Sequence, residues 1–246
     1  MSEPLTSNLD EKAFAVRALL GSALREHNRV VYSSSLGSEA MVLTDIIWSH
    51  LPDIDIFTID TGRLHEETYD LLDRIERRYQ RKLRVVYPDT RSLEGLVSAQ
   101  GINGFYESVE ARKLCCNLRK VAPFVRAIAE YSAWITGIRR GQSAARSRGK
   151  FVEWDSEYGL YKISPLLEWT EAEVWAYIRA RQLLYNPLHD RQFPTIGCSP
   201  CTRAIPPGEG RRSGRWWWEP AGPRECGLHP ETRPSPTADV AQPISV

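Results

Sequence analysis

Short apolar segments alternate along this chain with longer amphipathic segments, and this alternation restricts the fold more than any other feature. Strands are expected at residues 30–33, 55–59, 83–87 and 134–138. Helices are expected at residues 10–26, 39–50 and 66–79, and from just after Cys116 to about residue 130. This order predicts an α/β fold with a doubly wound, mostly parallel sheet. Ligands of such folds bind beyond the carboxyl ends of the strands, so the loops there should meet at one pocket.

The later part of the chain has a different character. Residues 151–163 are expected to form a hairpin. Thr170 and Glu173 form a capping box that opens a helix running to about residue 181. After Asn186 no periodic element is visible, which predicts an irregular C-terminal segment.

Length, charge and cysteine count exclude several classes of protein. The 246 residues suit one domain, interpreted as residues 1–229, with residues 230–246 as a disordered tail rich in proline and polar groups. A net charge of +1 argues against a general nucleic-acid or membrane-surface binder. No apolar run approaches the roughly 20 residues of a membrane helix, and the N-terminus lacks an apolar signal region. We therefore expect a cytoplasmic protein, whose five cysteines serve metal ligation or thiol chemistry rather than disulfides.

A loop of small residues follows the first expected strand and reads Ser33-Ser34-Ser35-Leu36-Gly37-Ser38-Glu39. Backbone N–H groups at a helix N-terminus bind anions, and small residues let a phosphate or ribose approach. The loop is not a Walker motif, because the Gly-Lys-Ser/Thr ending is absent. An ordinary tight turn between strand and helix explains it about equally well.

Arginines gather in two stretches, and guanidinium groups suit phosphate and sulfate oxygens because they bond in a bidentate way. Arg139 and Arg140 follow an expected strand, and Arg146 lies in the loop beyond; Arg212 and Arg215 lie in the late irregular segment. For any single one of them a solvated surface position is the more common alternative. A place at the carboxyl end of a strand favours substrate binding for the first two.

Four cysteines stand in two pairs, Cys115-Cys116 and Cys198-Ser199-Pro200-Cys201. Cys-x-x-Cys is a strong metal or redox spacing. Adjacent cysteines rarely ligate one metal, although the start of a helix could turn both toward one cluster. Spacing alone ranks an iron–sulfur site and a zinc site equally, with free buried thiols third. Lys120 lies one turn after Cys116, where its charge could serve thiolates and an anionic substrate.

The fifth cysteine, Cys226, lies in Glu225-Cys226-Gly227-Leu228-His229. Nearby Arg224 and His229 favour its thiolate, the reactive form, which indicates a nucleophile. An incidental exposed thiol is the equal alternative.

These residues together resemble a known family, the assimilatory adenylyl-sulfate reductases, which are the iron–sulfur branch of the phosphoadenylyl-sulfate reductases. The resemblance covers about residues 30–229. It is carried by the loop at 33–39, Asp60-Thr61-Gly62-Arg63-Leu64-His65-Glu66-Glu67-Thr68, Cys115-Cys116-Asn117-Leu118-Arg119-Lys120, Thr136-Gly137-Ile138-Arg139-Arg140-Gly141-Gln142-Ser143, Ile196-Gly197-Cys198-Ser199-Pro200-Cys201-Thr202, Gly214-Arg215-Trp216-Trp217-Trp218-Glu219 and Glu225-Cys226-Gly227-Leu228-His229.

The resemblance implies an adenine nucleotide alpha hydrolase-like fold, a [4Fe–4S] cluster, and reduction of adenylyl sulfate to sulfite and AMP with thioredoxin as electron donor. It assigns the cluster to Cys115, Cys116, Cys198 and Cys201. It makes Cys226 the nucleophile, on a mobile catalytic segment at about 204–229, and places around the phosphosulfate Lys120, Arg212, Arg215 and His229. It places in an arginine loop Arg139, Arg140 and Arg146, and at the nucleoside Ser33, Ser35, Gly37, Asp60 and Gly62.

The chain departs from the family pattern at two places. The family loop usually reads Gly-Ala-Glu-Asp, whereas this chain has Gly37-Ser38-Glu39-Ala40 and lacks the second acid. The family typically ends soon after Cys-Gly-Leu-His, whereas this chain runs on to Val246.

Three alternatives stay open at the level of sequence. The first is phosphoadenylyl-sulfate reduction on the same fold, although that branch typically lacks the four cysteines. The second is a nucleotide-activating sulfurtransferase or adenylyltransferase, which would typically carry Ser-Gly-Gly-x-Asp-Ser. The third is a non-enzymatic, zinc-stapled binding module. The sequence leaves homo-oligomerisation open.

Overall fold

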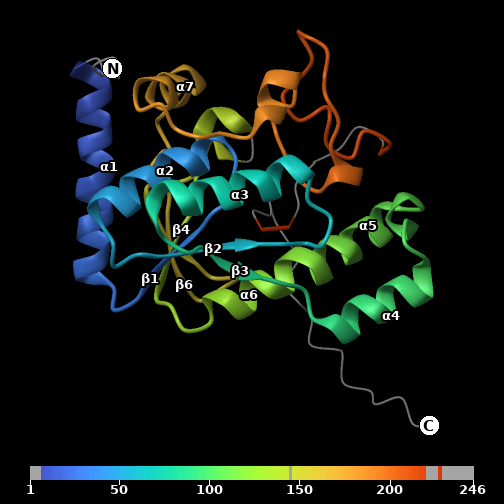
Figure 1. Cartoon of the computed structure of the whole chain (residues 1–246). Coiled ribbons are helices and arrows are strands. Elements are labelled where there is room, and N and C mark those ends of the chain that lie inside the picture. The colour runs from blue at the N-terminus through green and yellow to red at the C-terminus, as the bar shows by residue number, and fades with distance from the viewer. Residues whose placement is uncertain (1–6, 144–145, 220–226, 229–246) are drawn as a thin grey trace.

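A six-stranded sheet forms the centre of the protein, whose computed structural model describes residues 7–143, 146–219 and 227–228 (Figure 1). Its strands are β1 (Val30–Ser33), β2 (Asp55–Ile59), β3 (Arg84–Val86), β4 (Ala133–Ile135), β5 (Val152–Asp155) and β6 (Leu160–Ile163). Their order in the sheet is β3-β2-β1-β4-β6-β5. All neighbouring pairs are parallel except β5 and β6, which form an antiparallel hairpin at one edge.

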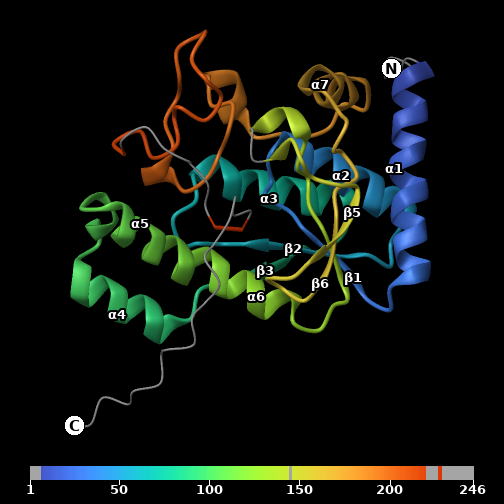
Figure 2. The ribbon, with the colours of Figure 1, turned by 180° about the vertical axis from the view of Figure 1, so that it is seen from behind.

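Helices cover both faces of this sheet, as Figures 1 and 2 show. One face carries α1 (Ser7–Glu26), α2 (Ser38–His50), α3 (Glu66–Tyr79) and α7 (Glu171–Ala180). The other carries α6 (Ala122–Ile128), which continues through a π-helical turn from α5 (Val109–Cys116), itself preceded by α4 (Thr90–Gln100). The fold is therefore α/β and doubly wound.

Alternation along each strand builds the two apolar layers. Val30 and Tyr32 of β1 pack under α1 and α2, whereas Val31 between them packs with α6 on the opposite face. Successive strand side chains point to opposite faces, so a strand buried on both sides is continuously apolar. The sequence Val30-Val31-Tyr32 meets this requirement, and all three side chains are buried.

The expected elements are found, with differences among the helices. The predicted helix after Cys116 begins earlier, because α5 already contains both cysteines in its last turn. Helix α4 was not expected, and the expected hairpin at residues 151–163 is found as β5 and β6, with β6 also joining the central sheet beside β4. On α1 the buried face is carried by Val16 and Leu20, whereas Phe14 is exposed.

The strand order reverses at β1, which lies between β2 and β4. Loops that leave β1 and β4 therefore diverge, and in open α/β sheets ligands bind in the crevice this leaves at the carboxyl ends. Gly137, just after β4, lies so near α2 that an added Cβ would stand 3.4 Å from the Cβ of Glu39. In the described part of the chain no helix is long and apolar enough to cross a membrane.

Candidate active site

A cavity of about 250 Å³ opens where the strand order reverses. Its walls come from the loops after β1, β2 and β4, from the end of α5, and from the irregular segment after α7. Predicted site residues that line it are Ser33, Ser35, Gly37, Cys115, Cys116, Lys120, Arg146, Cys198, Cys201, Arg212 and Arg215. Residues as far apart in the sequence as Ser33 and Arg215 thus face one space, as the loop positions predicted.

The serine loop forms one wall of the cavity at the N-terminus of α2. Ser34 and Ser35 fold the loop through their hydroxyls, which accept from the N–H groups of Leu36 and Gly37 at 3.4 Å. Gly37 is the N-cap of α2 and offers no capping side chain, so the first N–H groups of the helix can serve an anion. Ala40 is only 2% exposed and packs in the core, so the acid missing at this position would not have faced the cavity.

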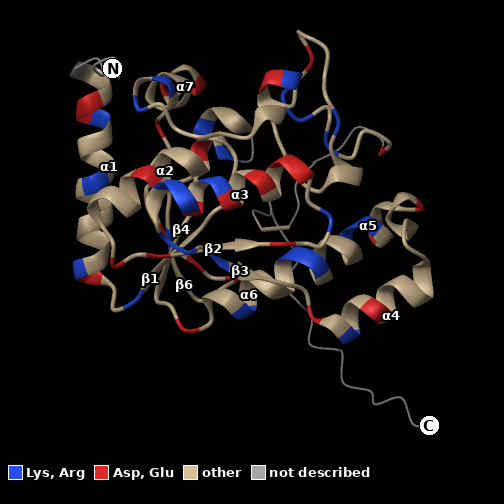
Figure 3. Cartoon of the chain, in the orientation of Figure 1, with Lys and Arg blue, Asp and Glu red and all other residues tan. Residues whose placement is uncertain are grey.

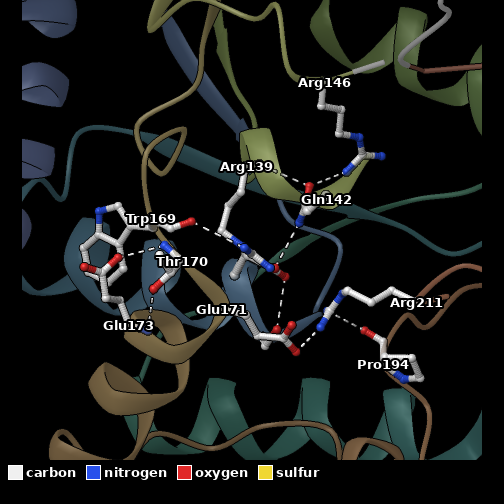
Figure 4. Close-up of polar contacts among 11 residues, drawn as sticks. Arg139, Gln142, Arg146, Trp169, Thr170, Glu171, Glu173, Pro194 and Arg211 are labelled. Atoms are coloured by element: carbon white, nitrogen blue, oxygen red, sulfur yellow. Dashed lines mark hydrogen bonds and ion pairs between the residues drawn. The ribbon is translucent and has the colours of Figure 1, made fainter. Parts of the chain in front are cut away.

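The arginine loop is organised around one buried carboxylate. Glu39 Oε1 accepts from Arg139 Nε at 2.8 Å and from Gln142 Nε2 at 2.9 Å. Burial would raise the pKa of Glu39, but the charge of Arg139 and these hydrogen bonds hold the pKa below its usual range. Gln142 Oε1 in turn accepts a hydrogen bond from the Arg146 guanidinium. Figure 4 shows this network, together with Arg211, which pairs with Glu171 and donates to the carbonyl of Pro194.

Two arginines of this loop do not line the cavity. Arg139 is buried against Glu39, and Arg140 pairs with Glu168 at 2.5 Å and with the carbonyl of Ser147. Arg146 is the member of the loop that borders the cavity. Substrate contact by Arg139 and Arg140 stays a prediction. In the structure their guanidinium groups bind Glu39 and Glu168, which stabilises the loop.

The turn after β2 is shaped by Asp60 and Gly62, neither of which lines the cavity. Asp60 Oδ1 accepts from the Gly62 N–H at 2.7 Å and from the Tyr69 hydroxyl at 2.9 Å, and Gly62 has a positive φ of 71°. The turn presents Thr61 to the cavity, where its hydroxyl lies 3.2 Å from Cys198 Sγ. Thr61 was not predicted as a site residue.

The four cysteines come together at one end of the cavity. Cys115 and Cys116 end α5, and Cys198 and Cys201 bracket a short 3-10 turn (Ser199–Cys201). All four pack with Phe105, Trp216 and Trp218. The pair lies at the end of a helix rather than at its start, and successive helical side chains diverge by about 100°. The π-helical turn that follows, Asn117–Val121, is a feature frequent at functional sites.

The surroundings of the cysteines fit an anionic, sulfur-rich group. Within the described chain, the indole N–H groups of Trp216 and Trp218 and the Nε of Arg119 and Arg215 are buried without a hydrogen-bond partner. Buried donors normally have a partner, so these point to an acceptor between the cysteines. No three His, Cys, Asp or Glu side chains of the described residues are placed to hold one metal ion. A four-iron cluster spreads its Cys₄ ligands over four metals, and these residues fit it.

Thiolate ligands in a largely buried site need nearby positive charge to stabilise their negative charge. Burial raises the pKa of the thiols of Cys115 and Cys201, and neighbouring thiols raise the pKa of Cys201 further. The guanidinium groups of Arg119 and Arg215 act in the opposite direction. Bound thiolates in this cavity therefore depend on nearby cations.

A buried ion pair joins the cysteine helix to the C-terminal segment. Arg112 donates to both carboxylate oxygens of Glu219, at 2.7 and 2.9 Å, and its guanidinium lies 4.5 Å from the ring centre of Trp216. Both side chains of the pair are under 10% exposed. Gly214 is required beside it, because an added Cβ would collide with the carbonyl of Arg203. Sequence reasoning missed Arg112 and Arg119, although each lies four residues from a cysteine, the spacing of neighbours on a helix.

Basic residues give the cavity its electrostatic character. Figure 3 shows Lys and Arg along the irregular segment after α7. Cationic residues that line the cavity include Lys120, Arg146, Arg211, Arg212 and Arg215. Cys226 and His229 lie outside the described residues, but Leu228 between them lines the cavity.

Comparison with known proteins decides the family. Residues 29–204 match the Phosphoadenosine phosphosulfate reductase domain, which is more than half of the chain. The chain belongs to this reductase family. Its relatives include the adenosine 5'-phosphosulfate reductases of Burkholderia cepacia, 48% identical over 92% of this chain and 90% of the relative, and of Allochromatium vinosum, 48% identical over 91% and 88%.

Solved structures agree with the fold of this reductase family. A phosphoadenylyl-sulfate reductase from Candida auris, in a phosphate complex, has a TM-score of 0.66 at 27% identity and covers 81% of this chain and 98% of its own. An FMN adenylyltransferase from Candida glabrata has a TM-score of 0.58 at 16% identity, covering 81% of this chain and 67% of its own. The first likeness supports the expected adenine nucleotide alpha hydrolase-like fold. The second concerns the fold alone.

Proposed function

We propose that this chain reduces adenylyl sulfate to sulfite and AMP in sulfate assimilation, and the proposal is supported by two relatives at 48% identity that are named adenosine 5'-phosphosulfate reductases. The observation that carries the proposal is the shared cavity. The serine loop at the N-terminus of α2, the four cysteines and several basic residues all line it. A nucleotide with a doubly anionic phosphosulfate matches this arrangement of donors and cations.

The serine loop and the cations have separate tasks in this proposal. The loop at Ser33, Ser35 and Gly37 receives the nucleoside, and Asp60 with Gly62 holds the turn beside it. Lys120, Arg212 and Arg215 offset the negative oxygens that would repel an incoming thiolate, and they stabilise the phosphate as it leaves.

Sulfur transfer proceeds in two steps. The Cys226 thiolate attacks the sulfur of adenylyl sulfate, the bond from sulfur to the bridging oxygen breaks, and AMP leaves from a Cys–SO₃ adduct, with His229 beside the reacting groups. A thioredoxin thiolate then attacks the Cys226 sulfur and releases sulfite. The second thioredoxin thiol resolves the mixed disulfide, so the dithiol is oxidised as sulfur goes from sulfate to sulfite. Because one cysteine is no dithiol, an external reductant such as thioredoxin is required, in keeping with a cytoplasmic enzyme.

Cys115, Cys116, Cys198 and Cys201 would hold a [4Fe–4S] cluster at the cysteine end of the cavity. When bound, the cluster would have a structural and electrostatic role rather than carry electrons to the substrate. The Thr61 hydroxyl, 3.2 Å from Cys198 Sγ, and the buried indole N–H groups of Trp216 and Trp218, which have no partner among the described residues, would be available as donors to such a group.

Adenylyl sulfate should react far faster than its 3′-phosphorylated form. The four cysteines and the names of the 48% identical relatives favour this branch of the family, whereas the neighbour at 27% identity is named for the 3′-phosphorylated substrate. A competition assay with both nucleotides and thioredoxin measures the preference. Faster sulfite release from the 3′-phosphorylated form would assign the chain to the alternative, phosphoadenylyl-sulfate reduction.

Removing a cation from the cavity should slow sulfur transfer. Lys120→Ala, Arg212→Ala and Arg215→Ala should each lower the rate roughly 10²-fold or more, the usual effect of losing an electrostatic donor in a closed site. Reactions with adenylyl sulfate that are quenched at successive times give the rate of sulfur transfer. Arg77→Ala, which removes a surface cation paired with Asp73, is the matched control and should have no effect. Near-normal rates in all three cavity variants would place the phosphosulfate elsewhere.

A further inference from the structure

Two residues directly after Cys226 are held by the wall of the cavity. Leu228 is only 7% exposed and belongs to the apolar cluster of α6 and β4 that includes Phe124 and Trp134. The carbonyl of Gly227 accepts a hydrogen bond from the Tyr158 hydroxyl at 3.4 Å. Gly227 has a positive φ of 87°, a conformation that favours glycine. The chain therefore makes both an apolar and a polar contact at this point.

The receiving surface is an aromatic socket formed by Phe124, Trp134 and Tyr158. These rings come from α6, β4 and the turn between β5 and β6. They contact one another edge to face, with ring centres 4.8 Å apart for Phe124 and Trp134, 5.1 Å for Phe124 and Tyr158, and 6.2 Å for Trp134 and Tyr158. Edge-to-face contacts of this kind stabilise the three rings against one another.

We propose that Leu228 is a positioning residue, whose docking in the aromatic socket places Cys226 at the cavity for attack on sulfur. The proposal rests on the proposed function, in which Cys226 is the nucleophile. Leu228 and Trp134 both line the cavity, so the socket belongs to its wall. Cys226 precedes Leu228 by two residues, which span at most roughly 7 Å when extended. A docked Leu228 thus confines Cys226 to the neighbourhood of the cavity.

Docking affects the two halves of the reaction differently. Adduct formation needs Cys226 inside the cavity, so it draws on the docked form. Discharge needs the sulfur of Cys226 to meet a second protein, so it draws on the undocked form. Weaker docking of Leu228 should therefore slow adduct formation and leave discharge of the adduct unimpaired. Replacing a residue that merely supports the fold would change the rates of adduct formation and discharge together.

The test uses Leu228→Ala in the full-length holoenzyme. Loss of a buried leucine side chain should shift docking by about tenfold or more. Adduct formation, followed by mass spectrometry after mixing with adenylyl sulfate alone, should slow by this factor, while discharge of the adduct by thioredoxin keeps its rate. Without substrate, alkylation of Cys226 by iodoacetamide should speed up by a similar factor. Leu228→Met should restore most of both rates, and Tyr158→Phe should give a smaller change in the same direction.

Leu160→Ala is the matched control, because Leu160 belongs to the same apolar cluster but is carried by β6. It should lower thermal stability without separating the half-reactions. Unchanged rates of alkylation and adduct formation in Leu228→Ala would overturn the proposed role of Leu228, as would equal slowing of adduct formation and discharge. Failure of the proposed function looks different, since wild-type protein would then form no adduct on Cys226 at all.

Discussion

Serine in place of Cys198 is expected to give a colourless protein that retains little iron. The thiolate of Cys198 is one of four proposed cluster ligands, and its sulfur lies 3.2 Å from the Thr61 hydroxyl. Among the described residues, the buried indole N–H groups of Trp216 and Trp218 nearby have no hydrogen-bond partner. A serine oxygen is a poor replacement for a thiolate on iron, because soft sulfur ligands select such clusters. Wild-type protein prepared without oxygen should be brown and hold about four irons per chain, the content of a Cys₄-bound cubane.

Visible absorbance and iron analysis of both proteins measure this effect. Ser199→Ala is the matched control, because it alters the same turn without removing a sulfur, and it should stay brown. Wild-type protein that is colourless and holds one zinc would contradict the cluster and favour the zinc-stapled alternative.

Replacing Cys226 by serine should abolish sulfite formation, by on the order of 10⁴-fold or more, as expected when a covalent nucleophile is lost. A serine hydroxyl is not ionised near neutral pH, and no sulfur remains for thioredoxin to attack. Iron content and AMP binding should be unchanged, because Cys226 is neither a proposed ligand nor part of the nucleoside loop. Sulfite assays with thioredoxin, together with iron analysis and AMP titration, measure these three properties. Sulfite production by Cys226→Ser at a substantial rate would assign the chemistry to another group.

The sequence predicted the sheet well because its strands are buried on both faces. Val30-Val31-Tyr32 must be apolar throughout to serve two helix layers, and such a run is visible without a structure. The capping box of α7 is equally local, with Thr170 accepting from the Glu173 N–H as expected. The position of β6 beside β4 is not local, since it depends on pairing across the sheet.

Details of the site were harder to predict because they depend on long-range partners. Arg112 meets Glu219 across 107 residues, and nothing near either residue indicates this pair. Arg139 stands at the carboxyl end of a strand, which suggested substrate contact, yet its guanidinium is bound to Glu39. The end of α5 and the following π-helical turn also escaped prediction, since helix phase is set by packing against Phe105 and Trp216.

The central claim, that Cys226 takes the sulfonate from adenylyl sulfate, is tested most directly by a single mixing experiment. Purified holoenzyme is mixed with adenylyl sulfate without reductant, digested, and its peptides are weighed by mass spectrometry. We predict that the peptide containing Cys226 gains the mass of one SO₃ group, while AMP appears in equal amount, and that thioredoxin then releases the group as sulfite. An SO₃ group on another cysteine, or AMP release with no adduct on Cys226, would contradict the account.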